Sequence, residues 1–343
     1  MLDTFSPYPL RLSYGVRRYA FGARLIETFL GKEGLPDGVI AETWEVSDHA
    51  SEPATVLNGA YAGRRLGELV QAYPDGLVRP GWRGPHLPLL VKFLDASHLL
   101  PVHVHPDDAV AASRYGEPNG KDEAWHVLWA EPDASVLVGQ RPGVERASLR
   151  AALLAQDYDA ALLRHPVRAG DTVDVPAGVL HTFGPGTLIL EVQQTSDLAE
   201  NAMPRDLYDR PLTSEAWHAN VDATLDLLTS DAHPRPDAGV LLHDDERVRR
   251  VQGCRNARFV LERWTLRAPL RVRLGEGGFA TLTTLDGSLA VACDGGHEVL
   301  PRASSCLLPA ATGEVTLEPV SGDALDVVVC FEPGDAPPRH DGV

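Results

Sequence analysis

Short runs of alternating apolar and polar residues, separated by turn residues, place the tightest limit on how this chain can fold. The runs include residues 91–94, 134–138, 171–175 and 187–192. Such alternation is typical of β-strands, because successive side chains of a strand point to opposite faces of its sheet. The chain has 31 Gly and 27 Pro, which supply turns between the runs. Regularly spaced short strands predict antiparallel sandwiches or barrels, so we expect a mainly β fold.

Helical spacing is confined to a few segments. We expect a short helix over 107–115, a helical insertion over about 145–165 made of 148–155 and 160–164, and a longer helix over 214–228. Thr213 or Ser214 can cap the longer helix, because a hydroxyl oxygen there accepts a bond from a free backbone amide. The helices are therefore expected as additions to a β scaffold.

A segment rich in Pro and Asp, residues 231–239, interrupts the regular pattern and is expected to be a linker. A chain of 343 residues is long enough for two domains of ordinary size. We therefore predict an N-terminal metal-binding domain over 1–230 and a smaller β domain over 240–343. The second domain has no His-x-His pair, so we expect it to lack a metal.

Charge and cysteine content exclude several classes of protein. The formal net charge is -17 at pH 7, which argues against binding to nucleic acid or to an anionic membrane. No run of apolar residues is long enough to predict a membrane span, and the first residues do not resemble a secretory signal. None of the four cysteines forms a Cys-x-x-Cys pair. We expect buried free thiols in a reducing compartment, and hence a cytoplasmic protein.

A split set of His and Glu residues predicts a metal site. His103 and His105 are two residues apart on a predicted strand, so both side chains point to one face of the sheet. Glu123 and His181 on later strands can complete a cage around one divalent ion. Three imidazoles and one carboxylate suit Zn, Fe, Mn, Ni or Co, and the ligand types alone do not choose among them.

The spacing around these ligands resembles the cupin superfamily. Residues 170–181 follow the pattern G-x5-P-x-G-x2-H, which is similar to the second cupin motif. The pair His103 and His105, with Glu123, resembles the first motif. The gap between His105 and Glu123 is longer than the usual one, and Pro185 stands in place of the final Asn of the second motif.

Six segments are similar to those of one family, the class I (type I) phosphomannose isomerases, which are zinc-dependent cupins. The segments are AETWEVSDH at 41–49, LLVKFLDA at 89–96, VHVHPDD at 102–108, GKDEAW at 120–125, GDTVDVPAGVLH at 170–181 and LEVQQTSD at 190–197. Their order and spacing resemble the family from about residue 10 to the end of the chain.

This resemblance implies a fold, an activity and a cofactor. The implied fold has two cupin-type β-barrel or jelly-roll units with a small helical insertion. The implied enzyme interconverts mannose 6-phosphate and fructose 6-phosphate, with a small-molecule sugar phosphate as its partner. The implied cofactor is one Zn²⁺ per chain, with other divalent metals as alternatives. Its ligands would be His103, in the place of a family Gln, with His105, Glu123 and His181.

An aldose–ketose isomerase moves a proton between neighbouring carbons through an enediol, so its site needs a base and a group that stabilises negative charge. Glu191 is our candidate base. Lys121 shares a face with Glu123 by alternation and is a candidate proton relay. The resemblance also implies a catalytic Arg, but Asn201 occupies that position. Arg205 is the nearest candidate to replace it.

Phosphate binding and overall function leave alternatives. Ser47 and Arg210 are candidates for binding the phosphate group, which needs hydroxyl and guanidinium donors. A cupin dioxygenase is a second reading, because three His and one Glu also suit non-haem iron. A non-catalytic sugar-binding or regulatory protein on the same scaffold is a third. We expect a monomer or a homodimer, with neither nucleic acid nor membrane as a partner.

Overall fold

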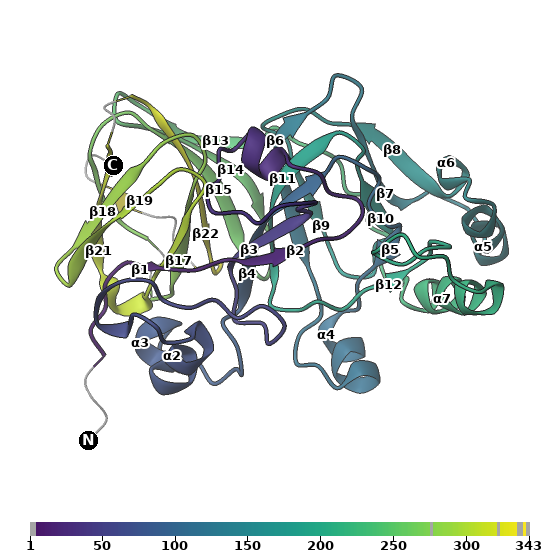
Figure 1. The fold of residues 1–343 in the computed structure, drawn as a ribbon, viewed down its shortest axis with the longest axis horizontal. Helices are drawn as coiled ribbons and strands as arrows, with labels where there is room; N and C mark the ends of the chain where they lie inside the picture. Colours follow the sequence, from purple (N-terminus) through teal and green to yellow (C-terminus); the bar gives the residue numbers. More distant parts are fainter. Residues whose placement is uncertain (1–4, 275–276, 321–322, 335–338, 341–343) are drawn as a thin grey trace.

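The computed structural model describes residues 5–274, 277–320, 323–334 and 339–340. Strands hold 37% of the residues and helices 17%, so the expected mainly β fold is confirmed. Figure 1 shows two β units side by side, formed by the N-terminal and C-terminal parts of the chain. Each unit consists of two antiparallel sheets, and within the described residues no sheet closes into a barrel. Each unit is therefore an open sandwich.

The N-terminal unit contains a six-stranded and a five-stranded sheet. The six-stranded sheet has the order β2 (Gly15–Arg17), β3 (Glu42–Val46), β4 (Leu89–Ala96), β11 (Thr187–Gln194), β6 (Glu123–Ala130) and β9 (Thr172–Val175). The five-stranded sheet has the order β12 (Glu200–Asn201), β5 (His103–Val104), β10 (His181–Phe183), β7 (Ser135–Gln140) and β8 (Leu162–Pro166).

The C-terminal unit contains a seven-stranded and a five-stranded sheet. The larger sheet has the order β1 (Leu10–Arg11), β20 (Ser305–Leu308), β17 (Ala280–Thr284), β22 (Leu325–Phe331), β15 (Val260–Leu266), β14 (Val248–Arg255) and β13 (Val240–Asp244). The smaller sheet has the order β19 (Gly296–Leu300), β18 (Leu289–Cys293), β21 (Glu314–Pro319), β16 (Leu270–Arg273) and β23 (Arg339–His340).

The two units share one topology. Adding 11 to the number of each strand from β2 to β12 gives its counterpart in the C-terminal unit, and the spatial order of the strands is the same in both. The segment predicted as a linker lies between α7, which ends the first unit, and β13, which begins the second copy of the topology. Strand β1 is outside the repeat. It pairs with β20, so the first residues of the predicted N-terminal domain extend the sheet of the other unit.

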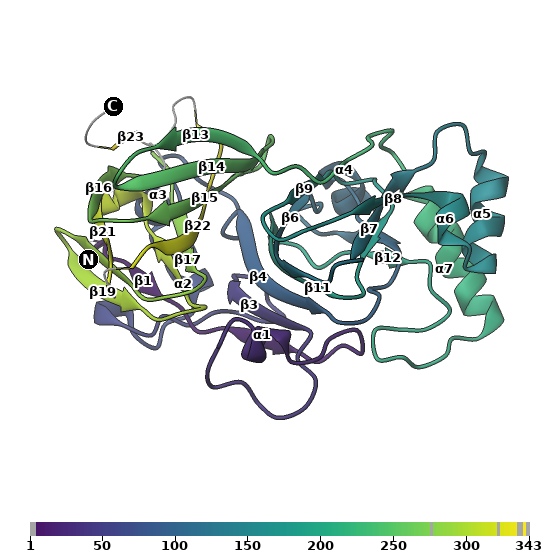
Figure 2. The same cartoon turned by 90° about the horizontal axis from the view of Figure 1, so that it is seen from above.

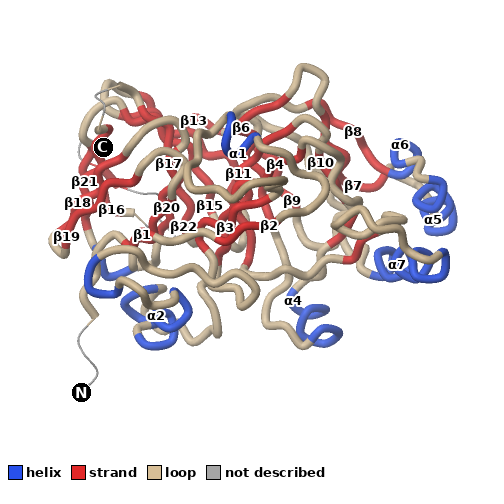
Figure 3. Tube along the Cα trace, viewed as in Figure 1, coloured by secondary structure: helices blue, strands red, loops and turns tan. Residues whose placement is uncertain are grey.

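Helices lie around the strands rather than between them, as Figure 3 shows. They are α1 (Leu25–Thr28), α2 (Leu66–Ala72), α3 (Pro74–Leu77), α4 (Asp108–Val110) with a π-helical turn at Ala111–Tyr115, α5 (Arg146–Ala155), α6 (Tyr158–Ala161) and α7 (Ser214–Asp226). Short 3-10 turns occur at Gly59–Tyr61 and Ala310–Thr312. Figure 2 shows α5, α6 and α7 at the outer end of the N-terminal unit.

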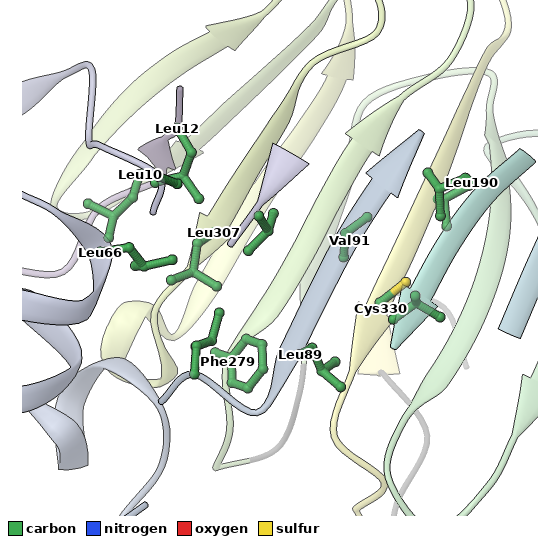
Figure 4. Close-up of a cluster of buried hydrophobic side chains, with 14 of the residues drawn as sticks. Leu10, Leu12, Leu66, Leu89, Val91, Leu190, Phe279, Leu307 and Cys330 are labelled. Carbon is green, nitrogen blue, oxygen red and sulfur yellow. The ribbon is translucent and has the colours of Figure 1, made fainter. Parts of the chain in front are cut away.

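Apolar cores separate the sheets. Trp125 and Phe183 fill the interior of the N-terminal sandwich, and Trp264 fills that of the C-terminal one. Between the units, Val91 and Leu190 from the six-stranded sheet belong to the same core as Leu261 and Cys330 from the seven-stranded sheet and Phe279, which directly precedes β17. Figure 4 shows part of this core. Because strands alternate, each strand of the six-stranded sheet presents one set of side chains to this inter-unit core and the other to the N-terminal interior.

The structure tests the predictions made for individual helices and for the cysteines. Thr213 caps α7 as predicted, because its hydroxyl accepts a hydrogen bond from the Ala216 amide at 3.2 Å. The predicted helix over 160–164 is wrong beyond Ala161, since residues 162–166 pair with β7 as an edge strand. The four cysteines are free, and three of them are buried. Among the described residues, no helix has both the length and the apolar character that crossing a bilayer needs.

Candidate metal centre

The four predicted metal ligands meet in the interior of the N-terminal sandwich. His103 and His181 lie directly opposite each other on β5 and β10, and His105 follows β5 on the same face. Glu123 begins β6 in the facing sheet. Their ligand atoms all lie within 4.8 Å of one another, and all four side chains are buried. Two sheets packed about 10 Å apart allow long side chains from both faces to meet midway.

Hydrogen bonds fix which nitrogen of each imidazole carries a proton. Each Nδ1 faces a backbone carbonyl: His103 that of Pro101 at 2.6 Å, His105 that of Leu198 at 2.7 Å and His181 that of Val179 at 2.8 Å. A carbonyl oxygen can only accept, so each Nδ1 is the donor. Such bonds hold metal-binding imidazoles in the tautomer that leaves the Nε2 lone pair available.

The three Nε2 atoms converge. Burial, and then the neighbouring His181, keep the pKa of His103 well below its ordinary value. Burial and Lys121 lower the pKa of His105 to about 3. The rings of His103 and His105 are therefore neutral near pH 7. The Nε2 atoms of His103 and His181 lie only 2.9 Å apart, and in this tautomer neither has a proton to donate. A cation between them satisfies both lone pairs.

Glu123 supplies the negative charge that such a cation requires. One of its oxygens lies 3.2 Å from Nε2 of His181, and the other lies 3.2 Å from Nε2 of His105. Its Oε1 also accepts a hydrogen bond from the indole of Trp125 at 2.8 Å, which orients the carboxylate. Three imidazole nitrogens and one carboxylate thus fit a divalent metal, by position and by donor type.

Two lysines and two further carboxylates lie beside the ligands. Lys121 Nζ lies 2.8 Å from Glu123 and 3.5 Å from Oε1 of Glu191. Lys92 Nζ lies 3.1 Å from the same oxygen of Glu191 and 3.5 Å from Glu42. All of these side chains are buried. Lys121 and Glu191 were predicted from the sequence as site residues, whereas Lys92 and Glu42 were not.

Burial and the neighbouring charges together shift the pKa values of this cluster. Burial, and then the charge of Glu123, raise the pKa of Glu191. For Lys92, burial acts to lower the pKa, but the carboxylates of Glu191 and Glu42 outweigh it and raise the pKa. Lys92 is therefore held as a cation. The signal for Lys92 was present in the sequence, because a lysine in an otherwise apolar strand is costly to bury without a carboxylate partner.

Comparison with known proteins identifies the family. Residues 10–127 match the model of the phosphomannose isomerase type I catalytic domain. A mannose-6-phosphate isomerase of Streptococcus mutans is 34% identical over 221 residues, which cover 64% of this chain and 68% of that protein. This chain belongs to the type I phosphomannose isomerase family. A putative mannose-6-phosphate isomerase of Bacillus subtilis is 32% identical over 202 residues, covering 56% of this chain and 63% of that protein.

Solved structures show the same fold. A mannose 6-phosphate isomerase from Bacillus subtilis superimposes with a TM-score of 0.81 at 22% identity, covering 95% of this chain and 99% of that chain. A putative mannosephosphate isomerase from Archaeoglobus fulgidus gives 0.73 at 22% identity, covering 96% and 100%. Membership of the phosphomannose isomerase family does not favour the dioxygenase or the non-catalytic alternative.

A cavity of about 210 Å³ opens onto the metal centre of this phosphomannose isomerase family member. Its polar wall includes Lys92, Lys121 and Glu191 beside the ligands, and its apolar wall includes Tyr19 and Leu100. Tyr19 was not predicted from the sequence, because its segment carries none of the recognised motifs. The cavity therefore combines a charged floor with an apolar side, which suits a small polyhydroxylated molecule.

Asn201 lines this cavity, where the resemblance led us to expect a catalytic Arg. It lies opposite His103 in the pairing of β12 with β5. Arg205 lines a separate cavity of about 380 Å³. The guanidinium of Arg205 donates to the carbonyl of Asp209 at 2.7 Å, and its side chain is half exposed. The two cavities share Phe21, Pro101 and Leu207 in their walls.

The structure does not bring the other two predicted residues to either cavity. Arg210 is largely exposed and forms an ion pair with Asp206 at 2.6 Å. Ser47 directly follows β3 and is fully buried, and its hydroxyl accepts a hydrogen bond from the His49 amide at 3.2 Å. Roles for these residues in phosphate binding remain predictions.

Proposed function

We infer that this chain is a metal-dependent aldose–ketose isomerase that interconverts mannose 6-phosphate and fructose 6-phosphate. One observation carries the inference: a buried three-His, one-Glu cluster opens onto a small cavity that also presents Glu191 between two lysines. A proton-transfer reaction next to a carbonyl needs this combination of an electrophile, a base and cations.

We propose zinc as the resident metal, held by the four ligands, with cobalt or manganese as functional substitutes. When bound, it supplies a Lewis acid that polarises the sugar carbonyl. The proposed donor set is compatible with several first-row metals, and preference for zinc rests on the family resemblance. The free cysteines also lead us to propose a cytoplasmic location.

Glu191 is the proposed base for the chemical step. Its carboxylate removes the proton from one carbon of the substrate and returns it to the neighbouring carbon, while Lys121 relays the hydroxyl proton from one substrate oxygen to the other. A carboxylate whose pKa is raised by burial is a stronger base than an ordinary one. Lys92 and Lys121 flank Glu191 and can stabilise the negative charge that develops on the substrate oxygens.

Arg205 is the proposed contact for the phosphate group. The cavity at the metal and the cavity at Arg205 adjoin through shared wall residues, so an extended substrate can reach from one into the other. A guanidinium can bind phosphate oxygens through two parallel N–H donors. Arg205 would have to exchange its contact with Asp209 for the phosphate.

A coupled assay tests the proposed function. The purified protein is stripped of metal, reloaded with zinc, cobalt or manganese, and supplied with mannose 6-phosphate while fructose 6-phosphate is measured. We expect turnover with at least one of the three metals and none in the stripped protein. Absence of turnover in every loaded form would reject the isomerase. Oxygen uptake by an iron-loaded form would support the dioxygenase instead.

A further inference from the structure

We propose that Arg258, which belongs to the C-terminal unit, is a positioning residue for the metal centre of the N-terminal unit. The proposal rests on the metal centre proposed above. It gives the C-terminal unit a role in the chemistry, although that unit has no metal-ligand cluster among its described residues.

Arg258 bridges two aspartates that stand next to metal-ligand segments. Its Nη2 donates to Oδ2 of Asp108 at 2.6 Å, and its Nε donates to Oδ2 of Asp122 at 3.1 Å. Asp108 lies three residues after His105, and Asp122 directly precedes Glu123. One guanidinium therefore connects the segment of one ligand with the segment of another.

The second oxygen of each aspartate extends the connection. Oδ1 of Asp122 accepts a hydrogen bond at 2.8 Å from the amide of Ala177, in the turn that leads to His181. Oδ1 of Asp108 accepts bonds from the Gly120 amide at 2.8 Å and from Nε2 of Gln194 at 3.0 Å.

Gln194 closes the network, because its Oε1 accepts a hydrogen bond from the Asp122 amide at 3.0 Å. Gln194 ends the strand that carries Glu191. The segments of three metal ligands and of the proposed base are thus tied together through Arg258 and its two carboxylates. Without the guanidinium of Arg258, the carboxylates of Asp108 and Asp122 would have no cation between them.

The exposure of these side chains indicates whether their ion pairs mainly stabilise the fold or mainly hold the metal ligands in position. The side chains of Arg258 and Asp108 are 38% and 39% exposed, so each ion pair is screened by water and contributes about 0–1 kcal/mol to folding. Its effect on the position of the ligands is separate from this energy. Groups bonded directly to metal ligands affect metal affinity by about 10–100-fold, and Arg258, one residue further out, should act toward the lower end of that range. Arg258 should therefore influence the metal site more than the global stability.

Arg79 offers a matched control. Its Nε lies 3.1 Å from Glu332, so it also joins the two units, and it lines the same inter-unit cavity of about 480 Å³ as Arg258. Its side chain is exposed to a similar extent, 44%, and it stacks on Trp82. Neither Glu332 nor Trp82 belongs to a metal-ligand segment. Loss of Arg79 should loosen the interface without moving the ligands.

Amide hydrogen exchange of the metal-free, full-length protein tests the proposal directly. We expect Arg258→Ala to speed exchange about tenfold or more in peptides covering 119–123 and 176–181. Arg258→Lys should give an intermediate rate, because an ammonium cannot bridge both aspartates as a planar fork does. Arg79→Ala should leave these peptides unchanged. The proposal is overturned if Arg258→Ala exchanges like the wild type, or if Arg79→Ala speeds the same peptides equally.

Cobalt affinity provides the second measurement. Competition with a chelator, followed by the visible absorption of bound Co²⁺, should show about tenfold weaker binding for Arg258→Ala and a change below about twofold for Arg79→Ala. Equal affinities for Arg258→Ala and the wild type would overturn the proposal. If the wild type takes up no cobalt, the metal centre fails, while the exchange rates still decide the role of Arg258.

Discussion

Arg250 and Glu262 form a buried ion pair, with Nη2 and Oε2 2.9 Å apart, on neighbouring strands β14 and β15 of the C-terminal unit. The repeat in topology makes β14 and β15 the counterparts of β3 and β4, where Glu42 and Lys92 form an ion pair. The strand registers match, so the acidic and basic residues have exchanged strands between the units. Arg250 and Glu262 are enclosed in an apolar core, whereas Glu42 and Lys92 line the cavity at the candidate metal ligands.

Breaking the enclosed pair should destabilise the protein strongly. Glu262→Gln keeps the shape but removes the carboxylate charge that faces the buried Arg250 guanidinium, so we expect the free energy of unfolding to fall by about 3–5 kcal/mol. Urea denaturation measures the change. Asp222→Asn, which removes the exposed partner of Arg150, is the matched control and should change the free energy of unfolding far less, because water screens that pair. A loss for Glu262→Gln as small as that of Asp222→Asn would contradict this view.

Removal of one imidazole should weaken metal binding. His181→Ala takes away one of the two facing Nε2 atoms, and we expect the affinity for Co²⁺ or Zn²⁺ to fall by roughly 100-fold or more. The thermal stabilisation by added metal should shrink in parallel, because binding to the folded state alone raises its stability. His165→Ala, on β8 of the same sheet, should bind metal like the wild type. Undiminished affinity of His181→Ala would remove it from the ligand set.

Lys92 should be needed for turnover more than for folding of the site. Lys92→Met removes the cation 3.1 Å from Glu191, and we expect kcat to fall by about 10²–10⁴-fold. The comparison variant is Lys32→Met, because Lys32 is equally buried and pairs with Glu45 at 2.9 Å, outside the cavity at the metal. Steady-state kinetics at saturating metal should show a normal kcat for the folded Lys32→Met protein. A kcat near the wild-type value for Lys92→Met would exclude Lys92 from the reaction.

Two exposed arginines can be separated by their kinetic effects. Arg205 lines a cavity next to the metal centre and Arg210 does not, so Arg205→Ala should raise KM for the sugar phosphate about tenfold with little change in kcat. Arg210→Ala should change neither constant. If Arg205 instead has the catalytic role of the missing family Arg, kcat will fall as well. A KM increase confined to Arg210→Ala would reverse the assignment.

His126 should make the protein sensitive to mild acid. Burial, and then the charge of Arg263, lower the pKa of His126 to about 3 in the folded state. The unfolded chain has an ordinary pKa of about 6.5 at this residue, so it binds more protons below that pH. The contribution of neutral His126 to the free energy of unfolding is fully present above pH 6.5. It is lost as the pH falls toward 3, and the loss is on the order of 4 kcal/mol.

Urea unfolding of the metal-free protein between pH 7 and 4.5 measures this dependence. His126→Gln should reduce the loss of stability with falling pH, because the variant has no group at this site that must gain a proton, while His103 and His105 still contribute to the loss. His297→Gln, at an exposed position, should follow the wild-type curve. Parallel curves for His126→Gln and the wild type would show that another group causes the acid sensitivity.

Local pattern was sufficient to predict much of the site. Alternation along a strand placed His103 and His105 on one face, and it placed Lys121 with Glu123. These are properties of a few consecutive residues, so a sequence contains them directly. The cap of α7 at Thr213 is local in the same way. Which metal these residues bind and how they act remain predictions.

Other features exist only in the tertiary structure. The family resemblance implied two cupin-type units, but the ligand motif does not repeat in the second one, because the strand registers place Ala280 of β17 where Glu123 stands in β6. Lys92 joins the site only because β11 brings Glu191 directly opposite it. Arg258 reaches Asp122 from more than 100 residues away in the chain.

The sequence by itself determined that the chain is mainly β and which side chains share the face that bears the ligands. The tertiary structure decided which of those faces meet, which arginines reach a cavity, and that the second unit encloses an ion pair in an apolar core. The physical reason is range. Side-chain direction along a strand follows from the local backbone, whereas the contact of two sheets depends on packing over the whole molecule.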